Sequence, residues 1–120
     1  MSADGETLTT RNYLFVCSQN KLRSPTAEHI FADIPGIATL SAGTNRDAEE
    51  PLTDELVAWA NVIFVMERPH RNKVQKKHRA ALKNKRLVVL DIPDEYEFMD
   101  PHLVRLLETK MQRWLPEERA

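Results

Sequence analysis

The sequence turns from a strand to a helix at Val16-Cys17-Ser18-Gln19-Asn20-Lys21-Leu22-Arg23-Ser24-Pro25. Before this junction, Tyr13 to Val16 is continuously apolar, as expected for a strand that is buried on both faces of a sheet. After it, Ser24 is a preferred helix N-cap and Pro25 suits the first helical position. The order of strand, polar loop and helix predicts the first unit of an alternating α/β chain.

The same alternation continues to the end of the chain. Further apolar runs predict strands at 37–42, 62–66 and 87–90, and helices are predicted at 24–34, 52–60, 69–82 and from 101 onward. Apolar strands separated by helices favour a parallel sheet that is covered on both faces. We therefore predict an α/β fold with a four-stranded parallel sheet, doubly wound in three α/β/α layers, and an active site at the carboxyl ends of the strands.

The overall composition predicts one globular domain over residues 12–120, preceded by a flexible polar tail at 1–11. The chain is 42% apolar and 29% charged, and no apolar run approaches the roughly 20 residues that span a bilayer. We therefore expect a cytoplasmic protein without a membrane partner. The net charge of -1 points to no class of partner, and the sequence leaves the oligomeric state and regulation open.

The chain has one cysteine, so no disulfide can form within it. Its four histidines lack the spacing of known metal-ligand motifs, and no metal or other cofactor is predicted.

The junction itself carries the predicted chemistry, with Cys17 and Arg23 six residues apart. Unpaired N–H groups at a helix N-terminus, together with the helix dipole, bind anions and stabilise a thiolate nucleophile. The guanidinium of Arg23 can hold two phosphate oxygens at once, and the Ser24 hydroxyl can donate a hydrogen bond to the thiolate. Asn20 is expected either to brace the loop or to adopt a left-handed backbone conformation within it. The other loop residues predicted to bind phosphate are Ser18, Gln19, Lys21 and Leu22.

Cys-x5-Arg-Ser-Pro directly after the first strand resembles the low-molecular-weight protein tyrosine phosphatases. The resemblance extends through Thr26-Ala27-Glu28, Ser41-Ala42-Gly43-Thr44 and Val62 to Met66, and so covers residues 12 to 115. It implies a phosphatase that hydrolyses phosphomonoesters, in particular protein phosphotyrosine, through a phosphocysteine intermediate. Arginine and backbone dipoles would supply the positive charge that a metal provides elsewhere.

The resemblance also implies a general acid, which that family takes from an Asp-Pro-Tyr loop near the C-terminus. The corresponding stretch here is Asp91-Ile92-Pro93-Asp94-Glu95-Tyr96. Asp94 is the preferred acid because it lies two residues before Tyr96, and Asp91 is the second candidate. Asp100 is interpreted as a helix cap. Tyr96 is expected to form one wall of the substrate pocket.

Two loop positions depart from the family pattern. Gln19 replaces the usual glycine, which raises the question of loop geometry. Leu22 replaces a second cysteine that is common in the family, so an oxidised Cys17 would have no internal disulfide partner. Residues 45–50 include no aromatic side chain, so specificity for phosphotyrosine is implied by the resemblance alone.

Several alternatives use the same loop. A phosphate-binding module without turnover would not need Asp94, an arsenate reductase would recruit further cysteines, and a phosphocysteine carrier would lack Arg23. A phosphatase acting on a small molecule or on a phosphorylated nucleic acid is a further alternative. Eight basic residues between Arg71 and Arg86 suit a nucleic acid, but no interleaved aromatic residues accompany them, and a solvated helix face is preferred.

Overall fold

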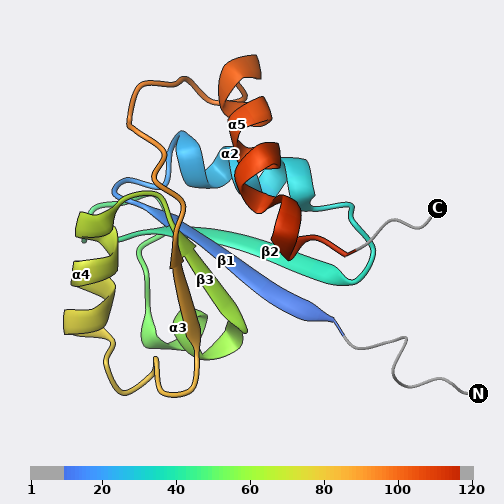
Figure 1. Ribbon diagram of the computed structural model, residues 1–120. Coiled ribbons are helices and arrows are strands. Elements are labelled where there is room, and N and C mark those ends of the chain that lie inside the picture. Colours follow the sequence, from blue (N-terminus) through green and yellow to red (C-terminus); the bar gives the residue numbers. More distant parts are fainter. Residues whose placement is uncertain (1–9, 117–120) are drawn as a thin grey trace, which may run out of the picture.

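The fold is built on a parallel sheet of four strands, which confirms the predicted architecture (Figure 1). The computed structural model describes residues 10–116. The strand order is β2-β1-β3-β4, and the strands are β1 (Arg11–Cys17), β2 (Ile37–Gly43), β3 (Val62–Val65) and β4 (Arg86–Val89). The chain leaves β1 toward β2 and then crosses to the other side of β1. The carboxyl end of β1 therefore lies at a switch point of the sheet, where ligands of such folds bind.

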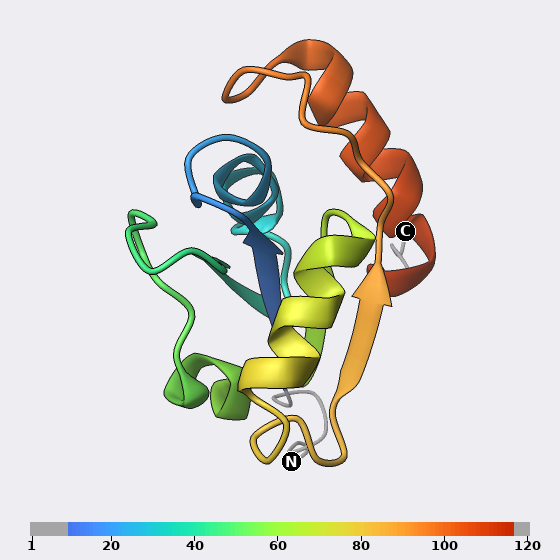
Figure 2. The same cartoon turned by 90° about the vertical axis from the view of Figure 1, so that its left-hand side faces the viewer.

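Helices cover both faces of the sheet (Figure 2). They are α2 (Arg23–Phe31), α3 (Asp54–Trp59), α4 (Arg68–Lys77) and α5 (Pro101–Met111), followed by a short 3-10 turn η1 (Gln112–Trp114). One core cluster joins the sheet to α2 and α5, and a second joins it to α3 and α4. The predicted three-layer arrangement is confirmed.

The central strand β1 is fixed from both sides. Tyr13 and Phe15 face α2 and α5, whereas Leu14 and Val16 face α3 and α4, because successive side chains of a strand point to opposite faces. Phe64 of β3 stacks on Phe15 at 5.3 Å and meets Tyr13 edge-on at 5.0 Å between ring centroids. Burial of such side chains contributes roughly 1.5–3 kcal/mol each. The strand that ends in the cysteine is thus among the best-supported parts of the chain.

Two predicted elements differ in their details. The strand predicted at 87–90 as fully buried is β4, which lies at the edge of the sheet and is only half-buried because it pairs with β3 alone. The helix predicted at 69–82 ends at Lys77, and turns follow it, with a left-handed residue at Asn84. A run of basic side chains with few apolar positions gives a longer helix little to pack against the sheet.

The sequence predicted Ser24 and Asp100 as helix N-caps, and the structure agrees only for Asp100. Asp100 caps α5 as predicted, since its carboxylate accepts a hydrogen bond from the N–H of His102 at 2.9 Å. Ser24 is not the cap of α2: the helix already begins at Arg23, Leu22 precedes it, and no side chain caps it. The Ser24 hydroxyl turns instead toward the cysteine.

The predicted tail at 1–11 falls largely outside the described residues, and its last residue, Arg11, is the first of β1. Within residues 10–116, no helix combines the length and the apolar character needed to cross a membrane.

Candidate active site

A small cavity of about 130 Å³ lies at the carboxyl end of β1 and collects most of the predicted site residues. It is lined by Cys17, Ser18, Gln19, Lys21, Leu22, Arg23 and Asp94. Larger grooves exist on the surface, but this one brings together a thiol, a guanidinium and a carboxyl group. The predicted nucleophile, phosphate-binding arginine and general acid are therefore neighbours in space.

In the loop between β1 and α2, carbonyl groups are hydrogen-bonded and N–H groups are left without partners. The carbonyl oxygens of Cys17, Ser18 and Gln19 accept hydrogen bonds of 2.9–3.0 Å from backbone N–H groups in the neighbouring segment 44–49. The N–H groups of residues 18–22 donate no hydrogen bond to any residue between 10 and 116. Unpaired N–H groups at a helix N-terminus are favourable partners for phosphate oxygens.

The loop and the segment after β2 approach each other closely at Gly43. A Cβ atom at Gly43 would lie only 2.5 Å from the Ser18 carbonyl oxygen and 2.5 Å from the Ala48 Cβ. Such distances lie well inside van der Waals contact, so a side chain would push the loop away. The glycine of the Ser41-Ala42-Gly43-Thr44 segment is needed for this approach.

Asn20 has both of the features predicted for it. Its backbone is left-handed, with φ of 59°, and its Nδ2 donates a hydrogen bond of 3.0 Å to the Ser24 hydroxyl. Gln19 is not among the residues with positive φ. Since the left-handed turn of the loop is made at Asn20, a glycine is not needed at position 19 for that reason, which resolves the question of loop geometry.

The Ser24 hydroxyl lies 3.0 Å from the Cys17 sulfur. Asn20 donates to the same hydroxyl oxygen, and the other acceptor nearby, the Ala42 carbonyl, is 3.5 Å away. The hydroxyl proton is therefore best placed on the line to the sulfur. The Ser24 hydroxyl is thus in position to donate a hydrogen bond to the sulfur.

Arg23 is 3% exposed and is fixed by bonds from one of its nitrogens. Nη1 donates to the Glu67 carboxylate at 2.8 Å and to the Ile92 carbonyl at 2.7 Å. Nε lies 3.7 Å from the Asp94 carboxylate. The carboxylates compensate the buried charge, and the edge formed by Nε and Nη2 can hold two oxygens of a phosphoryl group.

The structure separates the two candidate acids. Asp94 lines the cavity with a side chain that is 68% exposed, within 3.7 Å of the Arg23 guanidinium. Asp91 is exposed in a left-handed conformation, with φ of 58°, and does not line the cavity. Asp94 is therefore the candidate that the structure brings to the site.

Tyr96 is not brought to the cavity. It is half-buried and packs against the core cluster beneath α2 and α5, and it is not among the lining residues. The expected aromatic wall is absent from this cavity because the chain after Asp94 turns toward α2, where the Met99 N–H donates to the Thr26 hydroxyl at 2.9 Å.

Two residues of the site were not predicted from the sequence, Glu67 and His70. The backbone N–H of Glu67 donates to Nδ1 of His70 at 3.0 Å, so Nε2 carries the proton and donates to the Ser18 hydroxyl at 2.9 Å. Burial, followed by the positive charge of Arg23, lowers the pKa of His70 to about 4. His70 is thus neutral near pH 7 and holds the loop between β1 and α2 from the side of α4. Both residues follow β3 directly, and polar residues at the carboxyl end of a parallel strand are a signal that could have identified them.

Between residues 10 and 116, no three histidine, cysteine, aspartate or glutamate side chains are grouped so as to hold a metal ion.

Several solved structures resemble this fold. Wzb from Vibrio vulnificus, in complex with benzylphosphonate, has a TM-score of 0.71 and 22% identity, over 88% of this chain and 97% of its own. A low-molecular-weight phosphotyrosine phosphatase from Vibrio cholerae O395 has a TM-score of 0.69 and 22% identity, over 87% and 96%. The YwlE arginine phosphatase from Geobacillus stearothermophilus has a TM-score of 0.66 and 19% identity, over 90% and 99%.

No protein-family model and no curated protein matches the chain. The similarity to solved structures is therefore a similarity of fold, and it covers nearly the whole length of each matched protein. The described part of this chain has the α/β fold of the low-molecular-weight protein tyrosine phosphatases, with Cys17 as the last residue of the first strand.

Proposed function

We propose that this protein is a cysteine-dependent phosphatase that hydrolyses phosphomonoesters through a phosphocysteine intermediate. One observation carries the proposal: Cys17, Arg23 and four residues of the loop between them line one cavity, and the loop N–H groups have no hydrogen-bond partner between residues 10 and 116. These groups match the needs of a phosphoryl group that is attacked by sulfur while its oxygens are held in place.

In the first step, the Cys17 thiolate attacks phosphorus, and the S–P bond forms as the P–O bond to the leaving group breaks. The Nε and Nη2 edge of Arg23 and the loop N–H groups bind the three non-bridging oxygens, where the negative charge gathers. Asp94 lies beside this position and donates its proton to the leaving oxygen.

In the second step, the Asp94 carboxylate takes a proton from a water molecule, whose oxygen attacks phosphorus. The P–S bond breaks, inorganic phosphate forms, and Cys17 departs as a thiolate. The hydroxyl of Ser24, 3.0 Å from the sulfur, stabilises that leaving thiolate. The roles assigned to Asp94 in the two steps are the reverse of each other, and the enzyme returns to its initial state.

We propose protein phosphotyrosine as the substrate. The nucleophile is 4% exposed, which favours a phosphoryl group at the end of a long side chain. Lys21 is among the lining residues, and its positive charge disfavours the guanidinium of phosphoarginine, the other substrate class named among the proteins of this fold. Asp94 in the cavity favours turnover over simple phosphate binding, because a sensor needs no proton donor.

The test is hydrolysis of p-nitrophenyl phosphate in the presence of a chelator, with the wild type and Cys17→Ser. We expect metal-independent turnover that falls by at least about a thousandfold in the variant, since a serine hydroxyl is a far weaker nucleophile than a thiolate. Trapping of a phosphorylated protein after rapid acid quench would detect the intermediate. Full activity in the serine variant would rule out Cys17 as the nucleophile, and phosphate binding without turnover in the wild type would favour a sensor.

A further inference from the structure

A second cleft lies beside the catalytic loop, between α4 and the segment that follows β2. It has a volume of about 730 Å³ and is lined by Thr44, Asn45, Arg46, Asp47, Lys73, Lys76 and Lys77. We call it the basic cleft, because four of these side chains are cationic and one is acidic. In Figure 2, α4 and the loop after β2 are seen beside the loop that joins β1 to α2.

Both walls of the basic cleft are bonded to the catalytic loop. On one wall, the N–H groups of Thr44 and Asn45 donate to the carbonyl oxygens of Cys17 and Ser18 at 2.9 and 3.0 Å. On the other, His70 of α4 bonds the Ser18 hydroxyl at 2.9 Å, one helical turn before Lys73. A chain that occupies the basic cleft therefore lies next to a group held in the catalytic cavity.

The cations of the basic cleft are largely free of partners in the described part of the chain. Lys73 reaches across to the Asn45 side-chain oxygen at 3.3 Å, whereas Arg46, Lys76 and Lys77 form no hydrogen bond or ion pair with any residue between 10 and 116. Thr44 adds a buried hydroxyl oxygen that has no hydrogen-bond partner within the same range. The cleft thus offers unpaired positive charge and a polar floor to an anionic chain.

We propose that the basic cleft binds an acidic segment of a protein substrate, next to the phosphorylated side chain that enters the catalytic cavity. The proposal rests on the proposed phosphatase function and narrows its substrate to phosphotyrosine with acidic residues nearby in the sequence. A peptide is favoured over a nucleic acid because no aromatic side chain lines the cleft, and single-stranded nucleic acids bind by stacking on aromatic rings. Acidic side chains on a flexible peptide match separate lysine and arginine cations.

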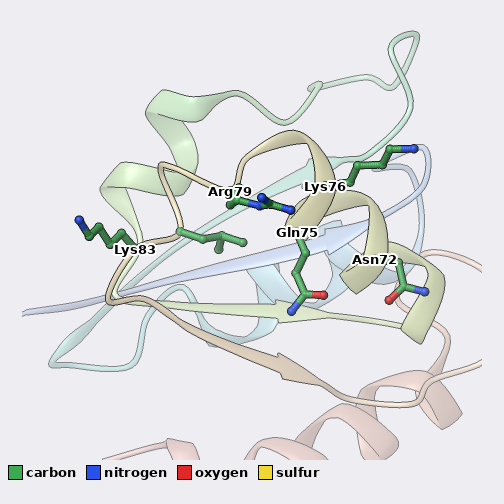
Figure 3. Close-up of a pocket in the computed structure, with 6 residues that line it drawn as sticks. Asn72, Gln75, Lys76, Arg79 and Lys83 are labelled. Atoms are coloured by element: carbon green, nitrogen blue, oxygen red, sulfur yellow. The ribbon is translucent and has the colours of Figure 1, made fainter.

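A neighbouring groove on α4, which shares only Lys76 with the basic cleft, provides an internal control. A groove of about 550 Å³ runs along the helix and the turns after it, lined by Asn72, Gln75, Lys76, Arg79, Leu82 and Lys83 (Figure 3). It is also basic, but none of its lining residues belongs to the catalytic cavity or to the segment after β2. Charge reversal in this groove changes the net charge of the protein without changing the charge of the proposed docking wall.

The test compares two charge-matched double variants, Arg46→Glu with Lys77→Glu in the basic cleft and Arg79→Glu with Lys83→Glu in the control groove. The substrates are two phosphotyrosine peptides that differ only in four glutamates against four glutamines, together with p-nitrophenyl phosphate. For the wild type we expect the acidic peptide to have a KM lower by about tenfold, a preference that weakens at high salt. The basic-cleft variant should lose this preference, and the control variant should keep it. Hydrolysis of p-nitrophenyl phosphate should stay within about twofold of the wild type in both variants, because that ester does not reach the cleft.

The outcomes separate the docking proposal from the proposed function. Equal kcat/KM for the two peptides, with normal turnover of p-nitrophenyl phosphate, would overturn the docking and leave the phosphatase intact. If no ester is hydrolysed, the phosphatase proposal fails, and fluorescence anisotropy of the same two peptides tests the cleft by itself. Binding of the acidic peptide that is lost only in the basic-cleft variant would support docking, and no binding would overturn it. Tighter binding of a single-stranded DNA oligonucleotide of equal charge would overturn it in favour of a nucleic acid.

Discussion

On one side of the cavity, residues 17–24 include four buried side chains and are bonded to the segment after β2, to Glu67 and to His70, whereas on the other, residues 91–96 are attached at few points. Asn20, Arg23 and Ser24 are all buried. Asp94, across the cavity, has a side chain that is 68% exposed. Its segment is joined to the first side through the carbonyl of Ile92, which accepts a hydrogen bond from Arg23.

This difference corresponds to two kinds of catalytic work. Groups that stabilise charge act best when they are fixed before the substrate binds, because they then need no reorganisation during the reaction. A proton donor has to reach a leaving group whose position varies with the substrate, and an exposed segment permits this. The buried side would therefore set the chemistry of the phosphoryl group, and the exposed side would only deliver a proton.

The largest expected effect concerns Asp94 on the exposed side, and its size depends on the leaving group of the substrate. We expect Asp94→Asn to lower kcat for phenyl phosphate by a factor on the order of 10² to 10⁴, because phenolate is a poor leaving group without a proton. The loss for p-nitrophenyl phosphate should be much smaller, because nitrophenolate leaves without help. Steady-state rates for the two esters measure the difference.

Asp91→Asn is the matched control for this prediction. It removes the same charge from the same segment, and asparagine tolerates the left-handed backbone found at Asp91, where φ is 58°. We expect its rates to stay within about threefold of the wild type, since surface substitutions away from a site have small effects. If Asp91→Asn lowered the rates and Asp94→Asn left them unchanged, Asp91 and not Asp94 would be the general acid.

The buried side was largely predictable from the sequence because its signals are local. An apolar run that ends in Cys17, a polar loop and a helix start already determine that cysteine, arginine and backbone N–H groups converge. The exact start of α2 was not predictable from Ser24 and Pro25, because the loop turns at Asn20 and uses the Ser24 hydroxyl for the sulfur instead of the helix end.

The contributions of distant segments were harder to predict. Glu67 and His70 reach the loop only because β3 lies beside β1, a pairing that depends on the order of strands in the sheet. Tyr96 was expected in the pocket from its place beside Asp94, but its ring packs against the core cluster instead. Interactions set by the tertiary fold leave little trace in local residue patterns.

The next largest effect concerns how closely the buried side is packed. In Gly43→Ala the added methyl group would lie 2.5 Å from the Ser18 carbonyl oxygen, so the loop or the segment after β2 has to move. We expect a loss of about 3 kcal/mol in the free energy of unfolding. We also expect weaker binding of phosphate as a competitive inhibitor, because the loop carbonyl and the adjacent N–H groups move together. Urea denaturation and inhibition constants measure the two effects.

Gly36→Ala controls for destabilisation alone. Gly36 has φ of 94° in the turn after α2, where alanine is strained but meets no atom closer than 3.7 Å. This variant should lose about 1 kcal/mol of stability and keep the phosphate affinity of the wild type. Equal losses of phosphate affinity in the two variants would mean that Gly43 acts through stability and not through the loop.

The smallest effect is the pH dependence that His70 gives to the buried side. Because its folded pKa is about 4 and the ordinary value is 6.5, the unfolded chain binds more protons between these values, and stability falls as pH falls through this window. From pH 7 to pH 5 the wild type should lose about 2 kcal/mol that His70→Asn does not lose. Urea denaturation at the two pH values measures the slopes, and identical slopes for wild type and His70→Asn would mean that His70 is not held neutral against the catalytic loop.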